Sequence, residues 1–153
     1  MHQLLCDGEE TNNVTFSPNG RLLAASHADR TATLWDPRHG TQMHVLEDIA
    51  GEVTCIAFSP DGKKLATGNR DGWIRTWEVR TGRPLVTLQV LPTIKPLRGK
   101  KDWIAFTPTG YYNASPGAAR FIRWRDGQRM LPAKALAERF RRPDLVVNAL
   151  KIK

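Results

Sequence analysis

Phe16-Ser17-Pro18-Asn19-Gly20 recurs along the chain as Phe58-Ser59-Pro60-Asp61-Gly62, at an offset of 42 residues. The same offset relates further pairs, namely Leu23-Ala24 and Leu65-Ala66, Asp29 and Asp71, Trp35-Asp36 and Trp77-Glu78, and Gly40 and Gly82. One matched pentapeptide carries little weight, but several landmarks that hold one offset without a gap indicate an internal repeat.

Each repeat is expected to consist of four short strands. In the second repeat, residues 53–58 are rich in β-branched and aromatic residues, which is typical of a buried strand. Pro60-Asp61-Gly62 then predicts a turn, because glycine adopts the positive φ that a tight return demands. Further strands are predicted at residues 64–68, 73–77 and 84–88. Four antiparallel strands in about 40–45 residues are typical of one β-propeller blade.

Residues 14–88 resemble two successive WD40 repeats, with Trp35-Asp36 and Trp77-Glu78 at the signature dipeptide. In that family a third-strand Trp, an Asp in the preceding turn, a second-strand Ser or Thr and a His before the first strand bond together. The resemblance implies this structural signature at Thr67, Asp71 and Trp77 in the second repeat, and at Asp29 and Trp35 in the first. Ala25 stands at the hydroxyl position of the first repeat, and Gly51-Glu52 stands where Gly-His is usual.

A third, divergent unit follows a basic, proline-punctuated connector. Residues 106–110 repeat the Phe-x-Pro-x-Gly pattern, and strands are expected at residues 111–115 and 121–124. A helix is predicted over residues 132–141, beginning at Pro132, and a second over residues 145–150, capped by Asp144. Leu136 and Phe140 form an i, i+4 apolar pair on the first helix.

The sequence therefore predicts a mainly β fold: a partial β-propeller of two WD40 blades plus a divergent third four-stranded unit, with a short C-terminal helical tail. The expected domains are residues 1–91 for the two blades, 92–130 for the connector and third blade, and 131–153 for the tail. Landmarks between Trp103 and Val146 resemble the propeller-closing segment of bacterial WD40 proteins that continue into a caspase-like peptidase domain.

Charge is unevenly distributed along the chain, whose formal net charge is +8. Residues 1–94 contain nine Lys or Arg and eleven Asp or Glu, whereas residues 95–153 contain fourteen basic and four acidic residues. Such a basic segment could meet nucleic acid, an anionic membrane or an acidic protein. The favoured interpretation is a solvated face with arginine stems packed on aromatic rings.

No catalytic, metal or cofactor motif is present, so we expect neither an enzyme nor a cofactor. Cys6 and Cys55 are the only cysteines, and Cys55 is expected to be a small core residue in the middle of a strand. His39 and His44 are expected to be exposed. Two cysteines without a framework favour a reducing, cytoplasmic compartment, and neither a secretory signal nor an apolar run of about 18 residues is recognised.

The leading functional hypothesis is a non-catalytic protein-interaction scaffold, the C-terminal part of a longer bacterial WD40 propeller. Its expected partners are proteins, or further copies that associate through open blades. Arg70 precedes the structural Asp71, on the face that WD40 proteins commonly use for partners, and is the candidate contact. The alternatives are a nucleic-acid- or anion-binding module acting through residues 95–153, and a regulatory piece of a caspase-like peptidase system.

Overall fold

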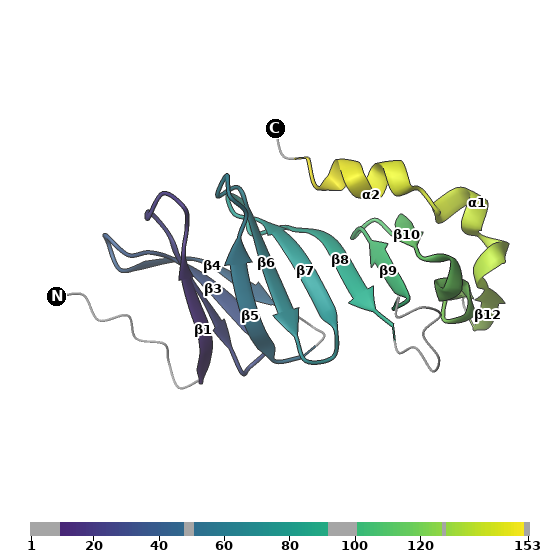
Figure 1. Ribbon diagram of the computed structural model, residues 1–153, viewed down its shortest axis with the longest axis horizontal. Helices are drawn as coiled ribbons and strands as arrows, with labels where there is room; N and C mark the ends of the chain where they lie inside the picture. The colour runs from purple at the N-terminus through teal and green to yellow at the C-terminus, as the bar shows by residue number, and fades with distance from the viewer. Residues whose placement is uncertain (1–9, 48–50, 92–100, 127, 152–153) are drawn as a thin grey trace. The chain divides into compact units, whose positions relative to one another are not determined.

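The computed structural model describes residues 10–47, 51–91, 101–126 and 128–151. The chain divides into two compact units, Met1–Leu85 (unit 1) and Val86–Lys153 (unit 2). Figure 1 labels most of the strands and both α-helices. No helix among the described residues is long and apolar enough to span a membrane.

The first repeat of unit 1 forms one antiparallel sheet in the order β1-β2-β3-β4. Its strands are β1 (Thr11–Phe16), β2 (Leu23–His27), β3 (Thr31–Asp36) and β4 (Thr41–Glu47). The turn between β1 and β2 places Gly20 at φ 67°, where glycine has no steric penalty. The four-stranded organisation expected for a blade is thus present.

The second repeat forms β5 (Val53–Phe58), β6 (Lys64–Asn69) and β7 (Trp73–Glu78), which pair antiparallel in this order. Gly62 repeats the turn geometry of Gly20, with φ 68°. The fourth predicted strand is β8 (Pro84–Val90), which begins at the end of unit 1 and continues into unit 2.

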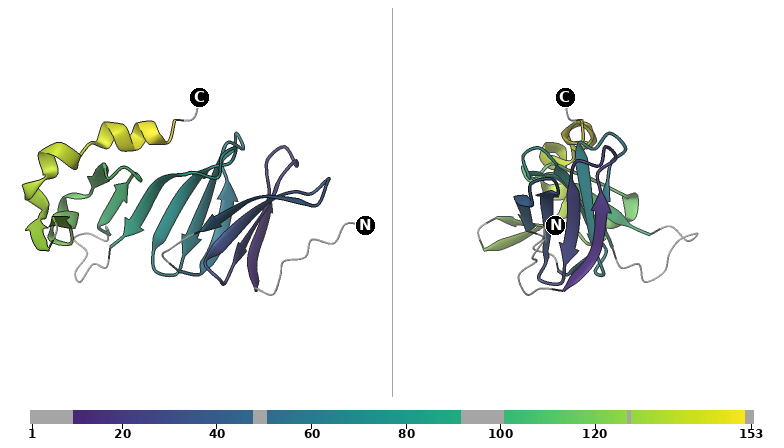
Figure 2. Two further views of the ribbon diagram at one scale, coloured as in Figure 1. Left: turned by 180° about the vertical axis from the view of Figure 1, so that it is seen from behind. Right: turned by 90° about the vertical axis from the view of Figure 1, so that its left-hand side faces the viewer.

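The core of unit 1 lies between its two stacked sheets (Figure 2). Aliphatic side chains of the first repeat form one cluster with aliphatic side chains and Trp77 of the second. The buried members are Ala24, Ala32, Leu34, Leu46, Ile56, Leu65, Trp77 and Val79. Each repeat therefore buries its apolar face against its neighbour, as expected for a repeat protein.

Unit 2 contains the remaining strands: the Val86–Val90 part of β8, β9 (Trp103–Phe106), β10 (Tyr112–Ala114), β11 (Arg123–Asp126) and β12 (Arg129–Pro132). Strands are present near residues 111–115 and 121–124, as predicted, but as parts of two different sheets; β12 is a further strand that the sequence did not place. β9 pairs with β8 and β10, whereas β11 and β12 form a separate hairpin.

The second edge of β10 pairs with the tail and not with β11. The 3₁₀ helix η2 (Pro116–Arg120) follows β10 and carries the chain away from it. The edge is taken instead by the tail, because Tyr112 forms a parallel bridge with Arg141 and its carbonyl accepts a hydrogen bond of 3.0 Å from the Arg142 amide.

The tail corrects the predicted helix over residues 132–141. Pro132 is the last residue of β12, where it pairs with Arg123, and is not the first residue of a helix. The short elements η3 (Ala133–Ala135) and α1 (Ala137–Phe140) follow, separated by Leu136, whose φ of −124° is not helical. The hairpin partner thus overrides the helix propensity of this segment.

The second predicted helix is present as α2 (Pro143–Ala149), with proline in its first turn. Asp144 does not cap it. The Asp144 carboxylate instead accepts two hydrogen bonds from the Arg142 guanidinium, at 3.0 and 2.7 Å. On the other side of α2, Val146 is buried against Val86 and Ala105.

Candidate functional site

The second repeat brings together two of its three predicted signature residues. The indole nitrogen of Trp77, on β7, donates a hydrogen bond of 3.0 Å to Oγ1 of Thr67, on β6. Both side chains are buried, Trp77 at 4% and Thr67 at 1% exposure. This bond satisfies the one polar atom of a large apolar side chain inside the core.

The first repeat makes the corresponding bond with a different residue. Thr33 on β3 lies opposite Ala25 on β2, and its Oγ1 accepts a hydrogen bond of 2.8 Å from the Trp35 indole. The imidazole Nε2 of buried His27 lies 2.8 Å from the same oxygen, and its Nδ1 lies 3.3 Å from Oγ1 of Thr11. Trp35 itself is half-buried, not largely buried as Trp77 is.

Sequence reasoning missed Thr33 and His27. The signal that could have found them is strand register: the residue opposite an Ala at a hydroxyl position is the nearest alternative source of a hydroxyl. His27 corresponds by the repeat offset to Asn69, which is polar and half-buried in the second repeat.

Asp29 and Asp71, the predicted turn aspartates, are both exposed. Oδ1 of Asp29 accepts hydrogen bonds from the Thr31 amide at 2.9 Å and the Thr31 hydroxyl at 2.7 Å. Slight burial acts to raise the pKa of Asp29, but these hydrogen bonds outweigh it and hold the pKa below its usual value. Asp29 therefore shapes its turn, in which Arg30 adopts a positive φ of 74°.

Arg70, the predicted partner contact, is exposed at the turn between β6 and β7. Asn69 stabilises this turn: its Oδ1 accepts hydrogen bonds from the Asp71 and Trp73 amides at 3.1 and 3.0 Å. Among the described residues, no acceptor is found for the buried Nδ2 of Asn69. The fixed backbone presents the Arg70 side chain at one end of unit 1.

The opposite end of unit 1 collects the β1–β2, β3–β4, β5–β6 and β7–β8 turns. These turns adjoin one another, since a Cβ built on Gly62 would lie 3.6 Å from Pro18, and His44 Nε2 lies 3.2 Å from the Arg80 carbonyl. The exposed cations of this basic end are Arg21, Arg38, Lys63, Arg80 and Arg83. His39 is exposed there as predicted, whereas His44 is half-buried.

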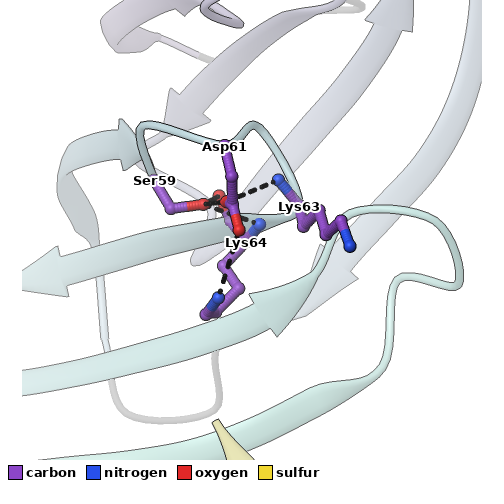
Figure 3. A network of polar contacts seen from close by, with 4 residues as sticks. All are labelled: Ser59, Asp61, Lys63 and Lys64. Carbon is purple, nitrogen blue, oxygen red and sulfur yellow. Dashed lines mark hydrogen bonds and ion pairs between the residues drawn. The ribbon is translucent and has the colours of Figure 1, made fainter. Parts of the chain in front are cut away.

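Figure 3 shows the hydrogen bonds and the ion pair of the Asp61 carboxylate at this basic end. Oδ1 of Asp61 accepts hydrogen bonds from the Ser59 hydroxyl at 2.5 Å and the Lys63 amide at 3.1 Å, and Oδ2 lies 3.7 Å from Lys64 Nζ. The Ser59 hydroxyl is the main cause that holds the pKa of Asp61 below its usual value. The β1–β2 turn has the same geometry, with Asn19 in place of Asp61.

Cys55 is exposed, which corrects its expected place in the core. The ladder between β5 and β6 shifts register between Val53 and Cys55, and an irregularity of this kind changes the face to which a side chain points. Within the described residues, no group of three His, Cys, Asp or Glu side chains is placed to hold a metal ion.

The basic segment of unit 2 has arginines that pack on aromatic rings and arginines that are exposed on a hairpin. Arg120 pairs with Asp102 at 2.8 Å and lies 4.8 Å from the centre of the Phe121 ring, and Arg139 lies 5.1 Å from that of Phe140. Arg123 and Arg129 are exposed on the β11–β12 hairpin. Some arginine stems thus pack on aromatic rings, and the hairpin carries exposed arginines.

The comparisons with known proteins concern mainly the repeats. A family model described as WD domain, G-beta repeat matches residues 6–36 and 40–78. A crystal structure of the RRP9 WD40 repeats and a structure of U3-55K are each similar, with a TM-score of 0.52 and 20% identity over 72% of this chain. This chain spans only 36% and 37% of their respective lengths. No curated protein sequence matches it.

Proposed function

Because this chain carries two WD40 repeats, we propose that it is a non-catalytic protein-interaction scaffold, the C-terminal part of a longer WD40 propeller in a bacterial cytoplasm. The RRP9 and U3-55K chains are much longer than this one, which supports a larger propeller. The resemblance of residues 103–146 to segments before caspase-like peptidases supports a bacterial source.

One observation carries this proposal: among the described residues, apolar side chains at the two edges of one face of the first sheet are exposed. Val14, Ala25, Thr33 and Val45 lie in one row across β1 to β4, so their side chains share a face, of which the middle pair, Ala25 and Thr33, is buried. Val14 is 58% exposed, Val45 50%, and Phe16, two residues along β1 from Val14, 60%. We call Val14, Phe16 and Val45 the open face.

The second repeat indicates what covers such a face. Ile56 and Phe58 correspond to Val14 and Phe16 by the repeat offset, and they pack against the first sheet in the core of unit 1. Ile56 is only 7% exposed. By the same logic a further blade, from a longer propeller or from a second copy, covers the open face.

Partner proteins bind, in this proposal, at the end of unit 1 that presents Arg70. Arginine is enriched at interface hot spots, and the fixed turn lowers the entropic cost of ordering it on binding. Arg83 is exposed at the opposite, basic end and gives a matched control.

Site-specific photocrosslinking tests the scaffold. A benzophenone amino acid replaces Phe16 in one sample and Met130, which is 64% exposed in unit 2, in the other. The proposal expects protein crosslinks, to a copy or to another WD40 chain, at position 16 and few at position 130. Equal labelling at both positions contradicts it. A third label at Arg70, compared with Arg83, tests the partner end in the same way.

A second candidate function, binding of nucleic acid or another polyanion through residues 95–153, is favoured by the exposed arginines of the β11–β12 hairpin. Binding of generic DNA or RNA that weakens steeply with salt supports it. Binding that stays weak at low salt, or that Arg123→Gln and Arg125→Gln leave unchanged, removes this alternative.

A further inference from the structure

Unit 2 contains a cavity of about 180 Å³ that no part of the scaffold proposal uses. Its walls are mainly apolar and include Tyr112, Ala114, Ile122 and Ala119. An engineered cavity of about 150 Å³ takes one benzene molecule, whereas drug-sized ligands occupy about 300–1,000 Å³. The cavity thus has room for one apolar side chain and is too small for a nucleotide cofactor.

Two cations, Lys134 and Arg141, also line the cavity. Both residues are exposed, whereas most of the other residues that line the cavity are apolar. Among the described residues, none that lines the cavity is acidic. A ligand that fits must therefore combine an apolar body with negative charge close to it.

Asp102, Asp144 and Glu138 form no ion pair with these cations in the described part of unit 2. Asp102 accepts hydrogen bonds of 2.8 Å from both the Ser115 hydroxyl and the Arg120 guanidinium. Asp144 is bound by Arg142. Glu138 is exposed on α1 and does not line the cavity, and none of the ion pairs found among the described residues includes Lys134 or Arg141.

Backbone hydrogen bonds or bridges fix the chain at or next to both cationic residues. Arg141 bridges to Tyr112 on β10, and the next amide donates to the Tyr112 carbonyl at 3.0 Å. The carbonyl of Ala133, next to Lys134, accepts a hydrogen bond of 3.1 Å from the Trp124 indole. Such preorganisation reduces the ordering that binding must otherwise impose.

We propose that this cavity binds the C-terminal residue of a partner protein, with an aliphatic side chain against Tyr112 and Ile122 and the terminal carboxylate held by Lys134 and Arg141. A C-terminal residue carries its carboxylate on the same Cα as its side chain, so one residue supplies both features within reach of the cavity. Cationic donors form strong hydrogen bonds with carboxylates. This inference rests on the scaffold function and names a class of partner.

The test uses the full chain and a fluorescent hexapeptide, Gly-Ser-Gly-Ser-Gly-Leu, with a free C-terminus. Fluorescence anisotropy measures its affinity beside two matched peptides, one with a C-terminal amide and one ending in Ser. The inference expects the free Leu peptide to bind at least tenfold more tightly than either, and its affinity to fall with salt. Equal affinity for the acid and the amide, or no binding of the Leu peptide, overturns it.

Substitutions locate the binding. Lys134→Gln and Arg141→Gln are each expected to lower the affinity for the peptide about tenfold. Ala119→Trp, which fills the cavity, is expected to abolish binding. Arg129→Gln removes an exposed charge elsewhere in unit 2 and should leave affinity unchanged; an equal loss in this variant contradicts the site. Thermal melts identify any variant that has lost its fold, and the Gln variants retain their test if Ala119→Trp unfolds.

A free small acid separates a peptide end from a metabolite. 4-Methylpentanoate carries the same branched chain and carboxylate without a peptide bond, so it should displace the peptide only at far higher concentration. Displacement at concentrations near the peptide Kd overturns the assignment to a protein C-terminus. If the peptide fails to bind while the crosslinks at position 16 persist, the cavity inference fails alone and the scaffold function stands.

Discussion

Thr33 faces Ala25 across β2 and β3, and its hydroxyl accepts the indole hydrogen bond of Trp35 at 2.8 Å. In the second repeat the hydroxyl stands on β6, at Thr67, and Arg75 occupies the position of Thr33. The hydrogen bond is thus kept in both repeats although its acceptor has moved to the neighbouring strand. A sequence departure at Ala25 does not leave the first repeat without its internal bond.

These hydroxyls should matter for stability. Thr67→Val leaves the buried Trp77 nitrogen without its acceptor, at a cost of about 1–3 kcal/mol in the free energy of unfolding. Thr33→Val should also destabilise, because Thr33 serves both Trp35 and His27. Urea denaturation gives the measurement, and Thr41→Val, at an exposed position of β4, is the control. A Thr67→Val loss no larger than that of the control contradicts this role.

Replacing the two signature tryptophans should lower the free energy of unfolding by different amounts. Trp77→Ala should cost about 3–5 kcal/mol, the usual range for a buried aromatic side chain, because Trp77 is 4% exposed in the core of unit 1. Trp35→Ala should cost less, since Trp35 is only half-buried. The same denaturation experiment compares them, and a loss under about 1 kcal/mol for Trp77→Ala refutes its place in the core.

The sequence predicts local features of unit 1 well because they depend on neighbours along the chain. The strands of unit 1 can be placed from the turns at Gly20 and Gly62 together with the β periodicity. Features that depend on distant pairing were missed: the exposure of Cys55 follows from a register shift, and the role of Thr33 from the residue opposite it. Pro132 was assigned to a helix because its pairing with Arg123 is not visible in a local pattern.

Acid should destabilise the β5–β6 turn by protonating Asp61. The pKa of Asp61 lies below its usual value of 3.8 when folded, mainly through the Ser59 hydroxyl. Its stabilising contribution is therefore complete above pH 3.8 and is lost as the pH falls through the lower, folded pKa. Asp61→Asn copies Asn19 of the first repeat and should keep the turn without this pH dependence. NMR titration of Asp61, and unfolding of both proteins between pH 2.5 and 5, check the sign; a raised pKa contradicts it.

Removing residues 131–153 should expose apolar surface in unit 2. Val146 packs on Val86 and Ala105, and Phe140 lies 5.1 Å from Trp124 between ring centres. We expect lower solubility and added binding of a hydrophobic dye in the shortened chain. Val146→Asp should show the same trend with the tail present, and Val147→Asp, at a 52% exposed position, is its control. Unchanged melting and dye binding in the shortened chain indicate that the tail is only appended.

Sedimentation at micromolar concentration tests the central proposal, that another blade covers the open face of the first sheet. The account predicts association that grows with concentration and that Val14→Ser and Phe16→Ser weaken, while Met130→Ser, equally exposed in unit 2, does not. A monomer that melts cooperatively and sediments identically with and without Phe16→Ser contradicts it.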